Sequence, residues 1–264
     1  MTITLAATHH DPEGRLYTQT ARMLPRLQAL FGDMVLHLTS TTQPRAEELL
    51  RAAGADITRE TDAPGGLTQL GRPRRAVIAQ ALTRGAQQMI FCDFDRMLHW
   101  AEFHADELAR VTGQTAARDF MVLGRTERAY DTHPRCQRDT EATINTVFAS
   151  ISGYAWDVGA GARSLSRRTA EAILAGCDDQ SVGVDCTWPL FLLCAGGFAV
   201  DHIATEGMEF ETADRYADQI AASGGVAAWI AQLDADPQQW ALRLDLARVE
   251  VAAMVGYSKE LLTR

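Results

Sequence analysis

The chain has 264 residues, of which 34 are acidic and 25 basic, so its net charge is −9 at pH 7. Its 47% apolar and 22% charged residues match the average of globular proteins, which excludes a disordered chain. The acidic balance argues against nucleic-acid binding, because proteins that bind nucleic acids present a basic surface. The length predicts one large α/β domain, or one such domain with a helical tail.

The cysteines and the apolar stretches indicate the compartment. The five cysteines form no CxxC pair and are odd in number, which favours a reducing compartment over a disulfide framework or a zinc ribbon. The N-terminus has no basic segment and too short an apolar run for a signal peptide. The longest apolar stretch, residues 188–200, has 13 residues, whereas a bilayer span needs about 20. We therefore expect a cytoplasmic protein with no membrane insertion.

Strands and helices alternate along the first part of the chain. Short apolar runs predict strands at residues 2–8, 34–38, 55–58 and 88–92. Apolar residues at helical spacing predict helices at residues 16–31, at 44–53 and from Pro73 to Gly85. The stretch 62–72 is rich in glycine and predicts a loop. This alternation is typical of a parallel sheet with helices on both faces, in which ligands bind at the carboxyl ends of the strands.

The pattern becomes less regular after Trp100. We predict further strands at residues 120–124, 158–164 and 197–202, and a polar loop at residues 125–138. We predict helices at residues 102–111, 141–151, 166–174 and 188–194. From Asp214 onward the chain is rich in alanine and helical, with breaks at Gly224-Gly225 and at Pro237. Its tryptophans, Trp229 and Trp240, are interpreted as packing residues, and a homodimer formed through this tail is left open.

Asp93-Phe94-Asp95 directly follows the predicted strand at residues 88–92 and is the sharpest chemical feature of the sequence. In an extended turn the side chains of residues i and i+2 point the same way, so both carboxylates face one cation. Hard divalent ions such as Mn²⁺ or Mg²⁺ prefer oxygen ligands and usually keep positions for substrate phosphates. Most such pairs are solvated loop carboxylates, but the position at the end of a strand in a βα array favours a metal site.

Taken together with this motif, the sequence resembles the GT-A class of nucleotide-sugar glycosyltransferases over residues 2 to 212. The resemblance rests on the opening strand with its polar end, on residues 71–76 (GRPRRA) leading a helix to Gly85, and on residues 90–95 (IFCDFD). It continues through residues 183–185 (GVD), which precede an apolar helix, and then a strand that ends at His202. The implied fold is a Rossmann-type α/β/α sandwich with a mixed, mostly parallel sheet and a helical C-terminal tail.

The resemblance implies a domain division and a chemistry. The catalytic domain would cover residues 1–212, with a nucleotide-binding half at 1–97 and an acceptor half at 98–212, followed by a helical extension at 213–264. In this class the DxD motif carries Mn²⁺ or Mg²⁺, which bridges the diphosphate of a UDP- or GDP-linked sugar donor. The sugar moves to a hydroxyl acceptor, and the absence of a membrane segment favours a small or cytoplasmic acceptor over a lipid.

The donor side of the site follows from the same resemblance and from charge. Asp95 would ligate the metal, and Asp93 would contact the ribose or a metal-bound water. The late His202 would complete the metal shell, although a structural histidine is an equal alternative. Thr8, His9 and Asp11 lie where this class holds the nucleoside.

Two arginines are candidates for the diphosphate. Arg72 and Arg75 lie where the helix before the DxD strand begins, and both helix N-termini and arginines favour phosphate. Ordinary surface arginines are the alternative at these two positions.

The acceptor side rests on two aspartates. Asp185 lies where the class places an acidic residue facing the acceptor, and in an inverting enzyme it would be the general base that deprotonates the hydroxyl. The usual pair at this place is Glu-Asp, whereas Val184 precedes Asp185 here. Asp157 begins a stretch with Gly159 and Gly161, whose small residues allow close approach to a ligand, so Asp157 is a candidate for binding sugar hydroxyls. The acidic stretch 208–211 is a candidate for further carboxylates near the metal, but a solvated face is the preferred interpretation.

Three other functions remain open. The DxD motif is also found in haloacid-dehalogenase-type phosphatases, but there it follows the first strand, and this chain's only lysine is Lys259. A sugar nucleotidyltransferase would open with a loop rich in glycine, arginine and lysine, whereas residues 9–15 contain one glycine and one arginine. A degenerate glycosyltransferase fold that only binds ligands would be expected to lose the metal carboxylates, and both are present.

Overall fold

The computed structural model describes residues 2–62 and 65–261, and for residues 258–261, which include Lys259, it describes the backbone alone. The described residues form one seven-stranded sheet in the order β3-β2-β1-β4-β6-β5-β7. The strands are β1 (Thr4–His9), β2 (Asp33–Leu38), β3 (Asp56–Arg59), β4 (Gln88–Asp93), β5 (Phe120–Arg125), β6 (Ala162–Ser166) and β7 (Val200–Thr205). Every strand pair is parallel except the two that β6 forms with β4 and β5.

The order of the first four strands creates a crevice. From β1 the chain moves outward to β2 and β3 and then returns to β4 on the other side of β1. The connections that leave β1 and β4 therefore diverge at this point of the sheet. Such a switch point is where open α/β sheets bind ligands, at the carboxyl ends of the strands.

Alternate residues of the central strands enter two separate hydrophobic cores. Leu5 and Ile90, which are register partners on β1 and β4, pack in one core, and their neighbours Ala6 and Phe91 pack in the other. Side chains of successive strand residues point to opposite faces, so continuous apolar runs give a sheet that is buried on both sides.

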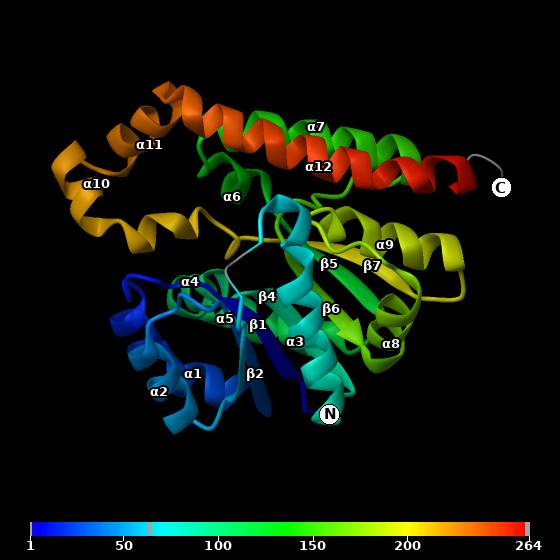
Figure 1. The fold of residues 1–264 in the computed structure, drawn as a ribbon, viewed down its shortest axis with the longest axis horizontal. Helices are drawn as coiled ribbons and strands as arrows, with labels where there is room; N and C mark the ends of the chain where they lie inside the picture. Colours follow the sequence, from blue (N-terminus) through cyan, green and yellow to red (C-terminus); the bar gives the residue numbers. More distant parts are fainter. Residues whose placement is uncertain (1, 63–64, 262–264) are drawn as a thin grey trace.

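Helices cover both faces of this sheet. The first core contains side chains from α1 (Tyr17–Leu30), α2 (Pro44–Ala52), α4 (Phe94–Phe103) and α5 (Ala105–Thr115). The second core contains side chains from α3 (Gly71–Thr83), α7 (Arg135–Ser152), α8 (Arg167–Gly176) and α9 (Val184–Ala195). The predicted α/β/α sandwich with a mixed, mostly parallel sheet is confirmed (Figure 1).

The C-terminal segment returns to this second face. It comprises the short helix η2 (Glu211–Arg215), α10 (Ala217–Ser223), α11 (Val226–Ala235) and α12 (Pro237–Leu261). Helix α12 runs beside α7 and also contacts α9, and its Ala247 and Met254 join the second core (Figure 1). The helical tail is thus packed onto the sandwich. None of the helices in residues 2–62 and 65–261 combines the length and apolar content that crossing a bilayer needs.

Several predicted boundaries were wrong. The helix predicted at residues 102–111 is divided between the end of α4, which begins at Phe94 directly after β4, and α5. The predicted loop at 125–138 contains α6 (Glu127–Asp131), which Thr126 caps by accepting the Ala129 N–H, and the start of α7. The loop predicted at 62–72 contains η1 (Leu67–Gln69) and the first residues of α3.

Strands β6 and β7 both begin later than predicted. Gly161, Gly196 and Gly197 adopt positive φ angles just before these strands, a conformation that turns the chain and ends an extended run. Each of the two strands therefore begins a few residues later than predicted, and the presence of each strand was predicted correctly.

Candidate active site

A cavity of about 480 Å³ opens at the carboxyl ends of β1 and β4, at the switch point of the sheet. The first strand contributes Thr8 and His9, and β4 with the start of α4 contributes Asp93 and Asp95. The remaining lining residues are His10, Thr39, Leu70, Pro73, Arg74, Glu211, Thr212, Arg215 and Tyr216. Segments far apart in the sequence therefore meet around the DxD motif.

Of the carboxylates in this cavity that form ion pairs, that of Asp93 is the most exposed to solvent. Its register partner Thr8 donates a hydroxyl hydrogen bond of 2.5 Å to Oδ1. Arg74 Nη2 lies 3.5 Å from Oδ2, and the Asp93 side chain remains 31% exposed. One oxygen is thus fixed by the neighbouring strand, while the other faces the cavity beside a cation.

Asp95 lies in the first turn of α4 and is held more tightly. The backbone N–H of Arg96 donates to Oδ1 at 3.0 Å, and Arg215 Nη2 donates to Oδ2 at 2.7 Å. Burial acts to raise the pKa of Asp95, but the charges of Arg215 and Arg96 outweigh it and lower that pKa. Asp95 is therefore an anion whose present counter-ion is an arginine from the C-terminal segment.

The helix η2 supplies a third carboxylate to the cavity. Glu211 Oε1 lies 3.5 Å from Arg96 Nε, while Oε2 is buried and accepts no hydrogen bond from the described residues. Burial raises the pKa of Glu211. Glu211 and Met208 are both buried, so the interpretation of residues 208–211 as a solvated face was wrong.

His9 lines the cavity, whereas Asp11 does not. The His9 ring packs edge-on against Phe94, with the ring centres 5.2 Å apart, and burial lowers its pKa to about 4. Neither ring nitrogen has a partner in the described part of the chain. Both carboxylate oxygens of Asp11 accept backbone N–H groups, from Arg15 at 2.9 Å and Leu16 at 3.0 Å. Asp11 thus orders the turn before α1.

The structure brings Arg74 to the aspartates, and not the predicted Arg72 or Arg75. The Arg75 guanidinium donates to backbone carbonyls at the end of α8, among them that of Leu174 at 3.0 Å. Arg72 donates to Gln69 at 3.0 Å. Arg74 was missed, although it lies one helical turn before the buried Ile78 and so on the inward face of α3.

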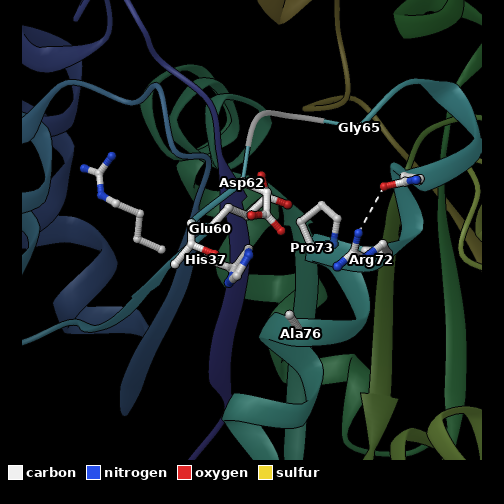
Figure 2. A pocket seen from close by; sticks show the side chains of 10 residues that line it. His37, Glu60, Asp62, Gly65, Arg72, Pro73 and Ala76 are labelled. Carbon is white, nitrogen blue, oxygen red and sulfur yellow. Dashed lines mark hydrogen bonds between the residues drawn. The ribbon is translucent and has the colours of Figure 1, made fainter.

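Arg72 instead lines a neighbouring pocket of about 230 Å³ between the ends of β2 and β3 and the start of α3 (Figure 2). Figure 2 shows Pro73 between Arg72 and the side chains of His37, Glu60 and Asp62, and Pro73 lines both this pocket and the main cavity. The two hollows are therefore adjacent along the sheet edge.

Asp185 lies in the first turn of α9 and reaches the other side of Arg74. Arg74 Nη1 donates to its Oδ2 at 2.7 Å, so one guanidinium links Asp185 to Asp93. The fully buried Arg163 donates to the Asp185 carbonyl at 2.7 Å and fixes the backbone there. Asp185 lines a smaller cavity rather than the one that holds the DxD motif.

Asp157 and His202 lie apart from this cavity. Asp157 accepts hydrogen bonds from the Arg125 guanidinium at 2.7 and 2.8 Å, from the Arg125 backbone at 2.9 Å and from Asn145 at 3.0 Å. Burial opposes its ionisation, but Arg125 outweighs burial and lowers the pKa of Asp157. The His202 ring stacks on Trp156 with an interplanar angle of 9° and lies against Gly124, where any side chain would collide with it.

The donor set suits a divalent cation that is completed by substrate. Across residues 2–62 and 65–261, no three His, Cys, Asp or Glu side chains converge into a ready-made cation cage. Mg²⁺ in nucleotide sites is usually bound by one or two carboxylates together with substrate phosphates, so a full protein cage is not required. Asp93 and Asp95 meet that need, and the unpartnered Oε2 of Glu211 adds a buried acceptor beside them.

Comparison with known proteins gives few similarities. No protein-family model and no curated protein matches the sequence. A glucosyl-3-phosphoglycerate synthase from Mycobacterium tuberculosis, solved with Mn²⁺, UDP and phosphoglyceric acid, is similar over 77% of this chain and 68% of its own, at 14% identity and a TM-score of 0.47. A cytidylyltransferase from Leptospira borgpetersenii is similar over 100% of this chain and 98% of its own, at 11% identity and a TM-score of 0.47. Both similarities are weak.

Proposed function

We propose that this protein is a metal-dependent glycosyltransferase that moves a sugar from a UDP- or GDP-linked donor to a hydroxyl group of a small acceptor. One observation carries the proposal. Asp93 and Asp95 meet Arg74 and Arg215 in a single large cavity at the switch point of the sheet. Carboxylates for a cation and arginines for phosphate are thus placed where α/β sheets bind nucleotides.

The donor diphosphate would lie between the two aspartates and the two arginines. Asp93 and Asp95 would hold Mn²⁺ or Mg²⁺, which neutralises charge on the diphosphate when it is bound. Arg215 donates to Asp95 and to the carbonyl of His10 at 2.7 Å each, so it is already aimed across the cavity. Thr8 and the neutral His9 add hydrogen-bonding groups on the β1 side.

Cleavage of the sugar–phosphate bond leaves additional negative charge on the departing diphosphate. Preorganised cations stabilise this charge as it develops, which is commonly the largest contribution to such catalysis. Arg74 is held by Asp93 and Asp185 at 3.5 and 2.7 Å, so its guanidinium needs little reorganisation to meet that charge. Asp185, on the far side of Arg74, would accept the proton of the acceptor hydroxyl.

The proposal is tested by thermal-shift titrations with UDP, GDP, ADP and their common sugar conjugates, each with and without Mn²⁺. A ligand that binds only the folded state at 100 times its Kd stabilises that state by about 2.7 kcal/mol. We expect a Mn²⁺-dependent shift with one of the nucleotides and its loss in Asp95→Asn. The matched control is Asp201→Asn, because Asp201 forms an exposed ion pair with Arg118 outside the cavity.

Three results would contradict the proposal. Asp95→Asn with an unchanged Mn²⁺-dependent shift would remove the DxD motif from the metal site. Absence of a shift with every nucleotide would favour a fold that no longer binds donors, and a shift with inorganic phosphate alone would favour a phosphatase.

A further inference from the structure

A second cavity, of about 140 Å³, lies beneath α12 and beside the main one. Leu70 and Arg74 line both cavities, so the two meet at the Arg74 guanidinium. Asp185 of α9, Glu141 of α7 and Arg243 of α12 contribute the other charged groups discussed below. The C-terminal segment thus forms one wall of each cavity, through η2 in the first and α12 in the second.

Two of the three acidic groups that line this second cavity are paired with arginines. Asp185 is paired with Arg74 at 2.7 Å. Glu141 receives the Arg125 guanidinium at 2.6 Å and the Gln137 amide at 2.9 Å. Glu250 is 6% exposed and receives a weak hydrogen bond from the Cys186 thiol at 3.6 Å, and burial raises its pKa. None of these three carboxylates forms an ion pair with Arg243.

The basic groups differ from one another. Arg74 is paired with aspartates, and Arg96 donates to the Ala160 carbonyl at 2.6 Å and faces Glu211. Arg243 is only partly buried, and its guanidinium forms no hydrogen bond or ion pair with any residue in the part of the chain that the structure describes. It also lines a third cavity, of about 240 Å³, beside α11. Arg243 is therefore the arginine of this cavity whose guanidinium has no partner among the described residues.

We infer that the cavity beneath α12 binds the acceptor and that this acceptor carries a carboxylate or phosphate group, which pairs with Arg243. The assignment to an acceptor rests on the proposed function, because Asp185 and Arg74 join this cavity to the donor site. A planar guanidinium binds a carboxylate or phosphate through two parallel hydrogen bonds and so fixes its orientation. An acceptor held in this way at Arg243 has its hydroxyl group free to face Asp185.

The test is a calorimetric titration of three small probes that share a hydroxyl-bearing carbon chain. These are glycerol 3-phosphate, D-glycerate and the neutral glycerol, and they are titrated into the wild-type chain, Arg243→Gln and Arg248→Gln. Arg248 is the matched control, because it lies exposed on the same helix and does not line this cavity. The melting temperature of each variant is compared with that of the wild type to verify folding.

We expect at least one anionic probe to bind well and glycerol to bind more weakly. The loss of a charge-assisted hydrogen bond in Arg243→Gln should lower the affinity for that anion by about ten- to a hundred-fold, and Arg248→Gln should leave it unchanged. Preference for glycerol 3-phosphate or for D-glycerate identifies the acidic group. Equal binding of glycerol and the anions, or an Arg243→Gln variant with wild-type affinity, would overturn the inference.

Two further outcomes separate this inference from the proposed function. If Arg215→Gln weakens anion binding and Arg243→Gln does not, the probes occupy the donor cavity and the second site is wrong. If the anions bind through Arg243 while no nucleotide binds in the presence of Mn²⁺, the anion site stands and its assignment to an acceptor is overturned.

Discussion

Two clusters of charged residues lie at the same edge of the sheet, and they differ in how completely their charges are paired. At the end of β4, Asp93 has one fixed oxygen and one that faces a cavity, and its side chain is 31% exposed. At the end of β5, Arg125 closes on Asp157 and Glu141, with its own side chain fully buried. Residue type alone does not predict these two environments. One oxygen of Asp93 remains open to a cavity, whereas both oxygens of Asp157 accept hydrogen bonds from Arg125 and Asn145.

This contrast predicts that the largest loss of stability follows a substitution in the cluster that Arg125 forms with Asp157 and Glu141. Asp157→Asn should destabilise the protein by about 3–5 kcal/mol, because it removes one of the two carboxylates that pair with the fully buried Arg125 side chain. Urea denaturation measures this change, with the exposed Asp201→Asn as the control, for which less than about 0.5 kcal/mol is expected. A loss below 1 kcal/mol in Asp157→Asn, with roughly the same loss in the control, would show that the cluster is not a structural unit.

A smaller effect is expected from His9, which joins the open cavity to the core. Burial lowers its pKa from an ordinary value near 6.5 to about 4, so the folded state favours the neutral ring. The neutral His9 ring contributes about 3 kcal/mol to the free energy of unfolding. This contribution is complete above pH 6.5 and is lost as the pH falls toward 4. The free energy of unfolding should thus fall over this range in the wild type and fall less steeply in His9→Asn. Identical slopes would contradict a buried neutral His9.

The smallest effect compares two arginines of α3. Arg75 donates to carbonyls at the end of α8, so Arg75→Met should cost about 2 kcal/mol of stability. Among the described residues, the Arg72 side chain donates a hydrogen bond to Gln69 alone, and Arg72→Met should change stability by less than about 0.5 kcal/mol. Parallel denaturation curves measure both. Equal losses of stability in the two variants would contradict a structural role for Arg75 and a surface role for Arg72.

Local patterns could predict the fold and part of the site. The alternation of apolar runs up to Cys92 predicted the sandwich, because strands buried on both faces read as continuous apolar stretches. It also predicted that Asp93 and Asp95 follow a strand, and both line the cavity. The spacing between Arg74 and Ile78 indicates that Arg74 lies on the inward face of its helix, but Arg72 and Arg75 were predicted instead.

The rest of the site depends on long-range contacts that no local pattern carries. Glu211 and Arg215 reach the DxD motif from a segment more than a hundred residues later in the chain, where they lie on η2. Asp157 is also positioned by a long-range contact, because its ion pair with Arg125 holds it away from the cavity. The sequence left His202 open between a metal ligand and a structural histidine, and its strand places it against Trp156.

The most direct test of the account is a calorimetric titration of UDP and GDP, in the presence of Mn²⁺, into the wild type, Asp95→Asn and His202→Asn. Loss of a charged ligand group should weaken binding of the preferred nucleotide by at least about ten-fold in Asp95→Asn. His202→Asn should bind as the wild type does, because His202 does not line the cavity. Wild-type affinity in Asp95→Asn, or an equal loss in both variants, would contradict the assignment of the ligand site to the cavity between β1 and β4.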